Sequence, residues 1–148
     1  MGLAGAKSRV VQMQPKSADI SAYVLVVDDE YLVRMMVCDC LREIGLKVME
    51  ACSGDDALCT LQAGVPVDVI LSDVRMPGSL DGLGLLQQSR AAYPDLPVII
   101  MSGHLSADDA LSKGAMHFLA KPFSIDAALA LVKHALVDSI ERADRRTL

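Results

Sequence analysis

The sequence predicts an α/β fold, a five-stranded parallel sheet covered by helices on both faces. Short apolar runs rich in Val, Ile and Leu alternate five times with segments of helical periodicity. Such alternation is typical of parallel sheets whose strands are joined by crossover helices. Hydrophobic residues make up 52% of the 148 residues, but aromatic residues only 3%. That composition favours aliphatic strands buried on both faces.

Five short segments in which apolar residues predominate predict the strands. They cover residues 23–27, 46–51, 67–71, 97–101 and 116–120. The first of them, residues 23–27, is continuous and β-rich, and we expect it to be buried.

Five segments with apolar residues three and four apart predict the helices, at about 31–44, 53–63, 82–92, 105–113 and 124–140. In the first, the face expected to meet the core carries Val33, Val37, Cys40, Leu41 and Ile44. Gly45 is expected to end that helix. Ser53 followed by Asp56 resembles a capping box and predicts the start of the second helix.

The length fits one compact domain over residues 22–138. We expect a flexible tail at 1–21, and the end of the last helix with a short tail at 139–148. The net charge of −5 argues against a general binder of nucleic acid or anionic membrane. No apolar run approaches the roughly 20 residues of a membrane span, so membrane insertion is not expected. The four cysteines lack CxxC spacing, which favours reduced thiols and a cytoplasmic location.

Polar residues follow four of the five strands, and carboxyl ends of parallel strands meet at one edge of a sheet. In strand order these residues are Asp28 and Asp29, then Asp73, then Ser102 and His104, then Lys121. Each alone has an ordinary explanation, such as a helix cap, a turn residue or a surface lysine. Their occurrence together at successive strand ends favours an assembled site.

Charge indicates what this site binds. Two carboxylates about 5 Å apart repel by roughly 3 kcal/mol at an effective dielectric of 20. Three converging carboxylates, Asp28, Asp29 and Asp73, therefore predict a cation among them. Hard oxygen ligands favour Mg²⁺, with Mn²⁺ as a possible substitute. Mg²⁺ and Lys121 together neutralise the three acids.

Four motifs occur in order at these strand ends: Val26-Val27-Asp28-Asp29-Glu30, Asp73-Val74-Arg75-Met76-Pro77 with Asp81-Gly82, Ser102-Gly103, and Lys121-Pro122-Phe123. They resemble the receiver domain of bacterial two-component response regulators, over about residues 22–138. The resemblance implies a flavodoxin-like, doubly wound fold with strand order 2-1-3-4-5, an order known from the family.

The resemblance also implies roles. Asp73 is expected to take a phosphoryl group from a phosphohistidine on a sensor histidine kinase or a histidine phosphotransfer protein. Metal ligands would be Asp29, Asp73 and the backbone carbonyl of Arg75, with Asp28 acting through water. Lys121 and Ser102 would contact phosphoryl oxygens.

Further roles follow from the same resemblance. Phe118 would move with Ser102 as a switch, and the Lys121–Pro122 bond is often cis in the family. Arg75 and His104 would tune loss of the phosphoryl group. Such a chain catalyses its own phosphorylation and dephosphorylation and need have no separate substrate.

Two departures from the family pattern stand out. The segment from Met76 to Asp81 is one residue longer than usual, with Gly78-Ser79-Leu80 inside it. Phe118 lacks the hydroxyl of the tyrosine that some members carry. Three alternatives stay open: a small Mg²⁺-dependent aspartyl phosphatase, the terminal receiver fragment of a hybrid histidine kinase, and an unphosphorylated scaffold. The phosphatase would want a second acid where Arg75 stands.

The output of the domain is a further expectation. The chain ends shortly after the last helix, so we expect a single-domain receiver without direct DNA binding. It would signal to a protein target or form a self-dimer through that helix. The expected inward stripe is Ile125, Ala128, Leu129, Val132 and Leu136, and the apolar outward positions are Ala127, Ala130, Leu131 and Val137. Movement of Phe118 on the adjoining strand would change the shape of this outward face. The alternative interpretation is that the apolar outward residues are ordinary, scattered surface aliphatics with no binding role.

Overall fold

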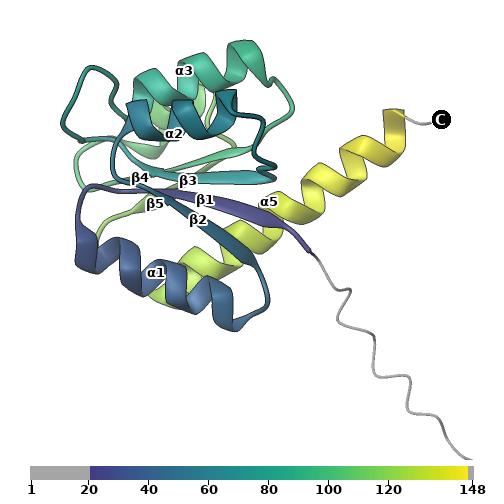
Figure 1. Cartoon of the computed structure of the whole chain (residues 1–148), viewed down its shortest axis with the longest axis horizontal. Coiled ribbons are helices and arrows are strands. Elements are labelled where there is room, and N and C mark those ends of the chain that lie inside the picture. Colours follow the sequence, from purple (N-terminus) through teal and green to yellow (C-terminus); the bar gives the residue numbers. More distant parts are fainter. Residues whose placement is uncertain (1–20, 147–148) are drawn as a thin grey trace, which may run out of the picture.

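The computed structural model describes residues 21–146, and it contains one sheet of five parallel strands (Figure 1). The strands are β1 (Tyr23–Val27), β2 (Lys47–Ala51), β3 (Val69–Asp73), β4 (Val98–Ser102) and β5 (His117–Ala120). Their order across the sheet is β2-β1-β3-β4-β5, and all neighbouring pairs are parallel. The predicted fold class and strand order are confirmed.

Helices cover both faces of this sheet. They are α1 (Tyr31–Glu43), α2 (Gly54–Gln62), α3 (Gly82–Ala92), α4 (Ala107–Ser112) and α5 (Ile125–Arg146). In Figure 1, α1 and the beginning of α5 lie below the sheet, α2 and α3 lie above it, and the rest of α5 extends to the right. Ala110 of α4 packs in the same core cluster as side chains of α2 and α3.

The alternation of side chains along β1 shows how one strand serves both layers. Val24 and Val26 pack in the core cluster between the sheet and helices α1 and α5. Leu25 and Val27 pack in the cluster between the sheet and helices α2 and α3. All four are 0% exposed. A central parallel strand has no solvent face, which explains its unbroken apolar sequence.

Two predicted helix signals, at the end of α1 and the start of α2, agree with the structure. Gly45, directly after the cap of α1, has a φ of +91°, which favours glycine over any residue with a Cβ. The Ser53 hydroxyl accepts a hydrogen bond from the Asp56 amide and caps α2. The Asp56 carboxylate accepts from the amide of Cys52, so the reciprocal bond of a capping box falls one residue earlier than predicted.

Several boundaries and one helix face differ from the prediction. Strand β3 begins and ends two residues later than predicted, so Asp73 is its last residue. Helix α5 continues to Arg146, beyond the predicted end at 140. On α1, Cys38 is buried while Cys40 is half-buried and Ile44 is 41% exposed. The core stripe of α1 is thus rotated by about one residue, because the sheet contacts Val37, Cys38 and Leu41.

The predicted N-terminal tail falls almost entirely on residues 1–20, outside the described residues. Within the described part, none of the helices combines the length and the apolar character that crossing a membrane requires.

Candidate functional site

The candidate site residues gather at the carboxyl edge of the sheet. Asp28 follows β1, Asp73 ends β3, Ser102 ends β4, and Lys121 follows β5. Since β3 lies between β1 and β4, Asp73 takes the central position. A cavity of about 570 Å³ opens there. Its polar lining consists of Asp29, Glu30, Asp73, Arg75, Ser102, His104 and Lys121.

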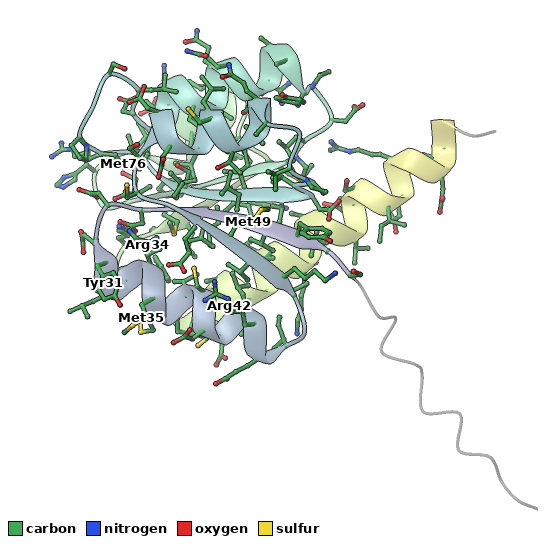
Figure 2. All side chains as sticks on the ribbon, viewed as in Figure 1. Tyr31, Arg34, Met35, Arg42, Met49 and Met76 are labelled. Atoms are coloured by element: carbon green, nitrogen blue, oxygen red, sulfur yellow. The ribbon has the colours of Figure 1, made fainter. Side chains whose placement is uncertain are left out.

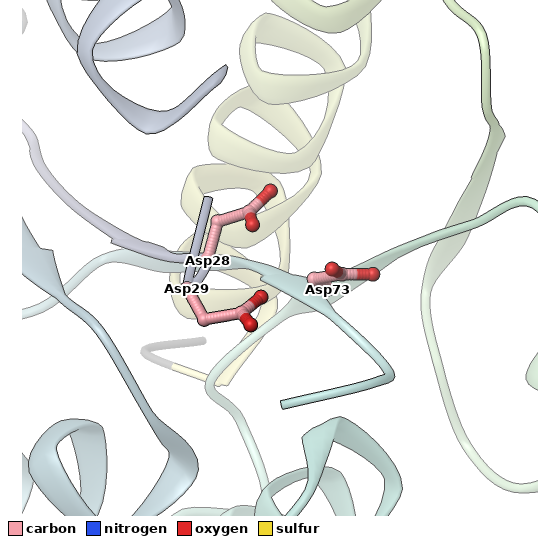
Figure 3. A group of neighbouring side chains, drawn as sticks. All are labelled: Asp28, Asp29 and Asp73. Atoms are coloured by element: carbon pink, nitrogen blue, oxygen red, sulfur yellow. The ribbon is translucent and has the colours of Figure 1, made fainter. Parts of the chain in front are cut away.

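Three carboxylates converge at this edge, as predicted (Figure 3). Asp28, Asp29 and Asp73 each offer an oxygen, and these oxygens lie within 4.8 Å of one another. Asp28 is 0% exposed and Asp73 7%, whereas Asp29 is open to solvent. Backbone amides orient the two buried acids: Asp28 Oδ1 accepts from Glu30 N at 2.9 Å, and Asp73 Oδ1 from Val74 N at 2.8 Å.

Lys121 supplies a positive charge to the same cluster. Its Nζ lies 3.3 Å from Asp28 Oδ2 and 3.2 Å from Asp73 Oδ2. Burial raises the pKa of Asp28 above its usual range, although the Glu30 amide and Lys121 act against the rise. Burial alone would lower the pKa of Lys121, but the joint attraction of Asp28 and Asp73 outweighs it and raises that pKa. Lys121 therefore stays charged at neutral pH.

The residues fit a divalent cation. One lysine offsets only one of three carboxylate charges, which leaves excess negative charge around the exposed Asp29. Receiver domains in general bind Mg²⁺ at an acidic cluster of this kind. Arg75 is exposed and lines the cavity, at the start of the loop after Asp73.

Ser102 is 4% exposed and organises the turn after β4. Its Oγ accepts hydrogen bonds from the amides of His104 at 3.1 Å and Leu105 at 3.0 Å. Both bonds use the oxygen as acceptor, which leaves the hydroxyl proton available to another partner. His104 is exposed and lines the cavity.

Phe118 lies on a different face from the one we expected it to influence. It is half-buried against the core cluster beneath α2, α3 and α4, whereas its neighbour Leu119 packs in the cluster beneath α5. Successive side chains of a strand point to opposite faces. Phe118 therefore faces the layer of the molecule opposite to α5.

The sequence pattern did not identify Arg34 of α1 as a residue that supports the site. Figure 2 labels Arg34 on α1. Its side chain is 14% exposed, and its guanidinium donates to the backbone oxygen of Asp28 at 2.6 Å and to Glu50 at 3.2 Å. Arg42, on the same helix, also contacts Glu50 but remains 44% exposed. Nothing in the spacing of the two arginines distinguishes these roles. The expected cis peptide bond at Lys121–Pro122 is confirmed.

The fold and the site together define a receiver-type acidic centre, and comparison with known proteins agrees. The family model for the response regulator receiver domain matches residues 24–133. The chain therefore belongs to the receiver domains of two-component response regulators.

Two curated relatives show which regulators the chain is similar to. The DNA-binding transcriptional regulator NtrC of Salmonella typhimurium is 42% identical over 128 residues, covering 84% of this chain and 27% of that protein. NtrC of Klebsiella pneumoniae is 45% identical over 114 residues, covering 75% and 24%. The chain thus spans about a quarter of the length of these relatives.

Solved structures show the same similarity. The receiver domain of NtrX from Brucella abortus has 36% identity and a TM-score of 0.71, covering 76% of this chain and 97% of that one. A CheY-like receiver domain protein from Methanospirillum hungatei has 22% identity and a TM-score of 0.76, covering 82% and 98%. The second similarity shows the fold alone.

These relatives correct our expectation about output. We inferred that the domain acts without direct DNA binding, on a protein target or as a self-dimer through the last helix. That inference is wrong, because the similar proteins are longer and bear the name of DNA-binding regulators. The packing of α5 also weakens the case for an apolar binding face on this helix. Ala127 and Leu131, assigned to the outward face, are half-buried and pack against the core.

Proposed function

We propose that this receiver accepts a phosphoryl group from a phosphohistidine onto Asp73, in a two-component phosphorelay and with Mg²⁺ bound. The observation that carries the proposal is the convergence at Asp73. Its carboxylate lies 3.2 Å from the Lys121 ammonium and has an oxygen within 4.8 Å of oxygens of Asp28 and Asp29. The receiver unit is proposed to span residues 22–138.

The chemistry expected of Asp73 is nucleophilic. A carboxylate oxygen forms a bond to phosphorus while the bond from phosphorus to the histidine nitrogen breaks, and the imidazole leaves with that electron pair. The Val74 amide holds Asp73 Oδ1 and thereby fixes the orientation of the carboxylate. The charged Lys121 then has a phosphoryl oxygen as a partner in place of an Asp73 oxygen.

Mg²⁺ would be held by Asp29, Asp73 and the backbone carbonyl of Arg75, with Asp28 acting through water. Bound there, it would neutralise charge on the phosphoryl oxygens. Asp28 is suited to the indirect role, because it is fully buried and already pairs with Lys121.

The remaining assignments concern response and lifetime. Ser102 would donate its free hydroxyl proton to a phosphoryl oxygen, and Phe118 would shift with it against the α4 side of the sheet. Arg75 and His104 line the cavity beside the acceptor, where they restrict attack by water. The aspartyl phosphatase alternative needs an acid at position 75, and Arg75 gives it no support.

The surroundings of the cavity suit a protein donor. Val33 and Met36 of α1 line it, and the neighbouring Tyr31 and Leu32 are 62% and 71% exposed. An apolar rim suits approach by another protein surface better than capture of a free phosphate ester. A cytoplasmic location belongs to the proposal, because all four cysteines are unpaired thiols, as a reducing compartment keeps them.

The test is intact-mass spectrometry after incubation with acetyl phosphate and MgCl₂. We expect one added phosphoryl group on the wild type, and none on Asp73→Asn or after chelation of Mg²⁺. The exposed Asp126→Asn on α5 is the matched control and should be phosphorylated normally. Uptake by Asp73→Asn equal to that of the wild type would refute the assignment.

A further inference from the structure

The loop that follows the acceptor, residues 74–81, is fixed at both ends. At its start, the Val74 amide donates to the Asp73 carboxylate, and the Val74 carbonyl accepts from Gly82 N at 2.8 Å. At its end, Asp81 caps α3 by accepting from Gly84 N at 2.8 Å. This loop contains the one extra residue relative to the usual pattern of the family, and its middle therefore needs its own support.

Asp55, in the first turn of α2, supports that middle. One carboxylate oxygen accepts from Ser79 N at 3.1 Å and from Leu80 N at 3.3 Å. The other accepts from the Ser79 hydroxyl at 2.7 Å. The hydrogen bond from the Ser79 hydroxyl is the largest of the contributions that lower the pKa of Asp55, so the carboxylate is ionised at neutral pH. Three donors from the middle of the loop, two on Ser79 and one on Leu80, thus converge on the carboxylate of Asp55.

Two glycines allow α2 and the loop to approach so closely. Gly78 has a φ of +102°, and a Cβ there would lie 2.7 Å from Asp55 Oδ2. A Cβ on Gly54 would meet the backbone oxygen of Leu80. The contact between Asp55 and the loop is therefore built into the backbone on both sides, unlike a chance meeting of two surface side chains.

We infer that Asp55 is a positioning residue for the phosphoryl-acceptor site, acting through residues 74–81. The same loop carries Arg75, whose side chain lines the cavity and whose carbonyl is the proposed metal ligand. By holding Ser79 and Leu80, the Asp55 carboxylate fixes the path of the loop and therefore the position of the Arg75 carbonyl. The inference rests on the proposed function, because it assigns Asp55 to the Mg²⁺ site formed around Asp73.

The test is isothermal titration of the full chain with MgCl₂ alone. Asp55→Ala should weaken Mg²⁺ binding by about tenfold, the low end of what partners of metal ligands contribute. Ser79→Ala removes one of the three bonds and should weaken binding by a smaller factor. Because both changes act on one contact, the double variant should bind like Asp55→Ala. Asp55→Asn keeps an acceptor oxygen and should recover part of the loss.

The control is Asp56→Ala, which removes the same charge from the same helical turn without touching the loop. Asp56→Ala should bind Mg²⁺ with an affinity within about twofold of the wild type. This control separates the effect of loop positioning from the effect of losing one negative charge near the site. Equal losses in Asp55→Ala and Asp56→Ala, or additive losses in the double variant, would overturn the inference. If Asp55→Ala does not fold, the Mg²⁺ affinities of Ser79→Ala and Asp55→Asn can be compared with those of the wild type and Asp56→Ala instead. Normal Mg²⁺ affinity in the Asp55 variants, with uptake abolished in Asp73→Asn, would defeat this inference and leave the proposed function intact.

Discussion

Replacing Lys121 with Met separates the stability of the acidic site from its affinity for metal. Methionine keeps the length of the side chain and removes the charge. In the native protein, Lys121 Nζ lies 3.3 Å from Asp28 and 3.2 Å from Asp73. Each pair attracts by about 5 kcal/mol at an effective dielectric of 20. Most of this is offset by removing the charges from water, so the net loss is much smaller than the sum.

We expect Lys121→Met to lower the free energy of unfolding by about 2 kcal/mol without metal. That is below the usual loss for a fully buried pair, because the Lys121 side chain is 21% exposed and Asp28 can take up a proton instead. The pKa of Lys121 is raised above 10.5 in the folded state. Its stabilising effect is therefore fully present at neutral pH, and is lost as pH rises through the raised pKa.

Metal affinity should change in the opposite direction. Lys121 and a divalent cation repel each other across the acid cluster, by roughly 1 kcal/mol at the dielectric of an open site. Lys121→Met should therefore bind Mg²⁺ about fivefold more tightly. Urea unfolding with and without MgCl₂ measures both effects, with exposed Lys133→Met as the control. Weaker Mg²⁺ binding, together with unchanged stability without metal, would refute the electrostatic account of this site.

Three further predictions concern other parts of the molecule. Arg42 and Arg34 outweigh the effect of burial and lower the pKa of Glu50, so Glu50→Gln should cost about 0.5 kcal/mol at neutral pH. Urea unfolding at several pH values should show that cost vanishing as pH falls below 4.5 through the lowered pKa. Burial raises the pKa of Cys38 to about 12, so at pH 8 a disulfide reagent should modify exposed Cys52 and Cys59 and reach Cys38 only after unfolding. The acyl phosphate of the wild type should outlast that of the Arg75→Ala, His104→Ala double variant, followed by intact mass over time; a longer-lived variant would reverse the proposed shielding.

The strand ends were predictable because they depend on local pattern. A buried strand shows as an apolar run, and a polar residue directly after it marks the edge of the sheet. Asp28, Asp73 and Lys121 each follow such a run, and the structure brings them into contact. The observed β3 begins and ends two residues later than predicted, but Asp73 still lies at the carboxyl end of the strand, so its predicted place at the edge of the sheet is unchanged.

The faces of helices were less predictable. Counting every third and fourth apolar residue placed Cys40 inside and Leu131 outside, whereas both side chains are half-buried in the structure. A helix rotated by one residue keeps the same periodicity, so the pattern does not determine which edge of its apolar stripe meets the sheet. The error about α5 arose in this way, since half-buried residues at the edge of the stripe were counted as exposed.

Arg34 and Asp55 show what no local pattern contains. Each is a charged residue early in a helix, where solvent exposure is the usual outcome. Arg34 extends from α1 to the carbonyl of Asp28, and Asp55 extends from α2 to Ser79 in the loop after Asp73. Because α1 and α2 cover opposite faces of the sheet, the two acid-bearing segments are held from opposite sides (Figure 1). The proposed function requires this site to stay open to a metal and a phosphoryl group. Packing across the mouth of the cavity would close it, so contacts from behind and beside the acids are the ones that can fix their geometry.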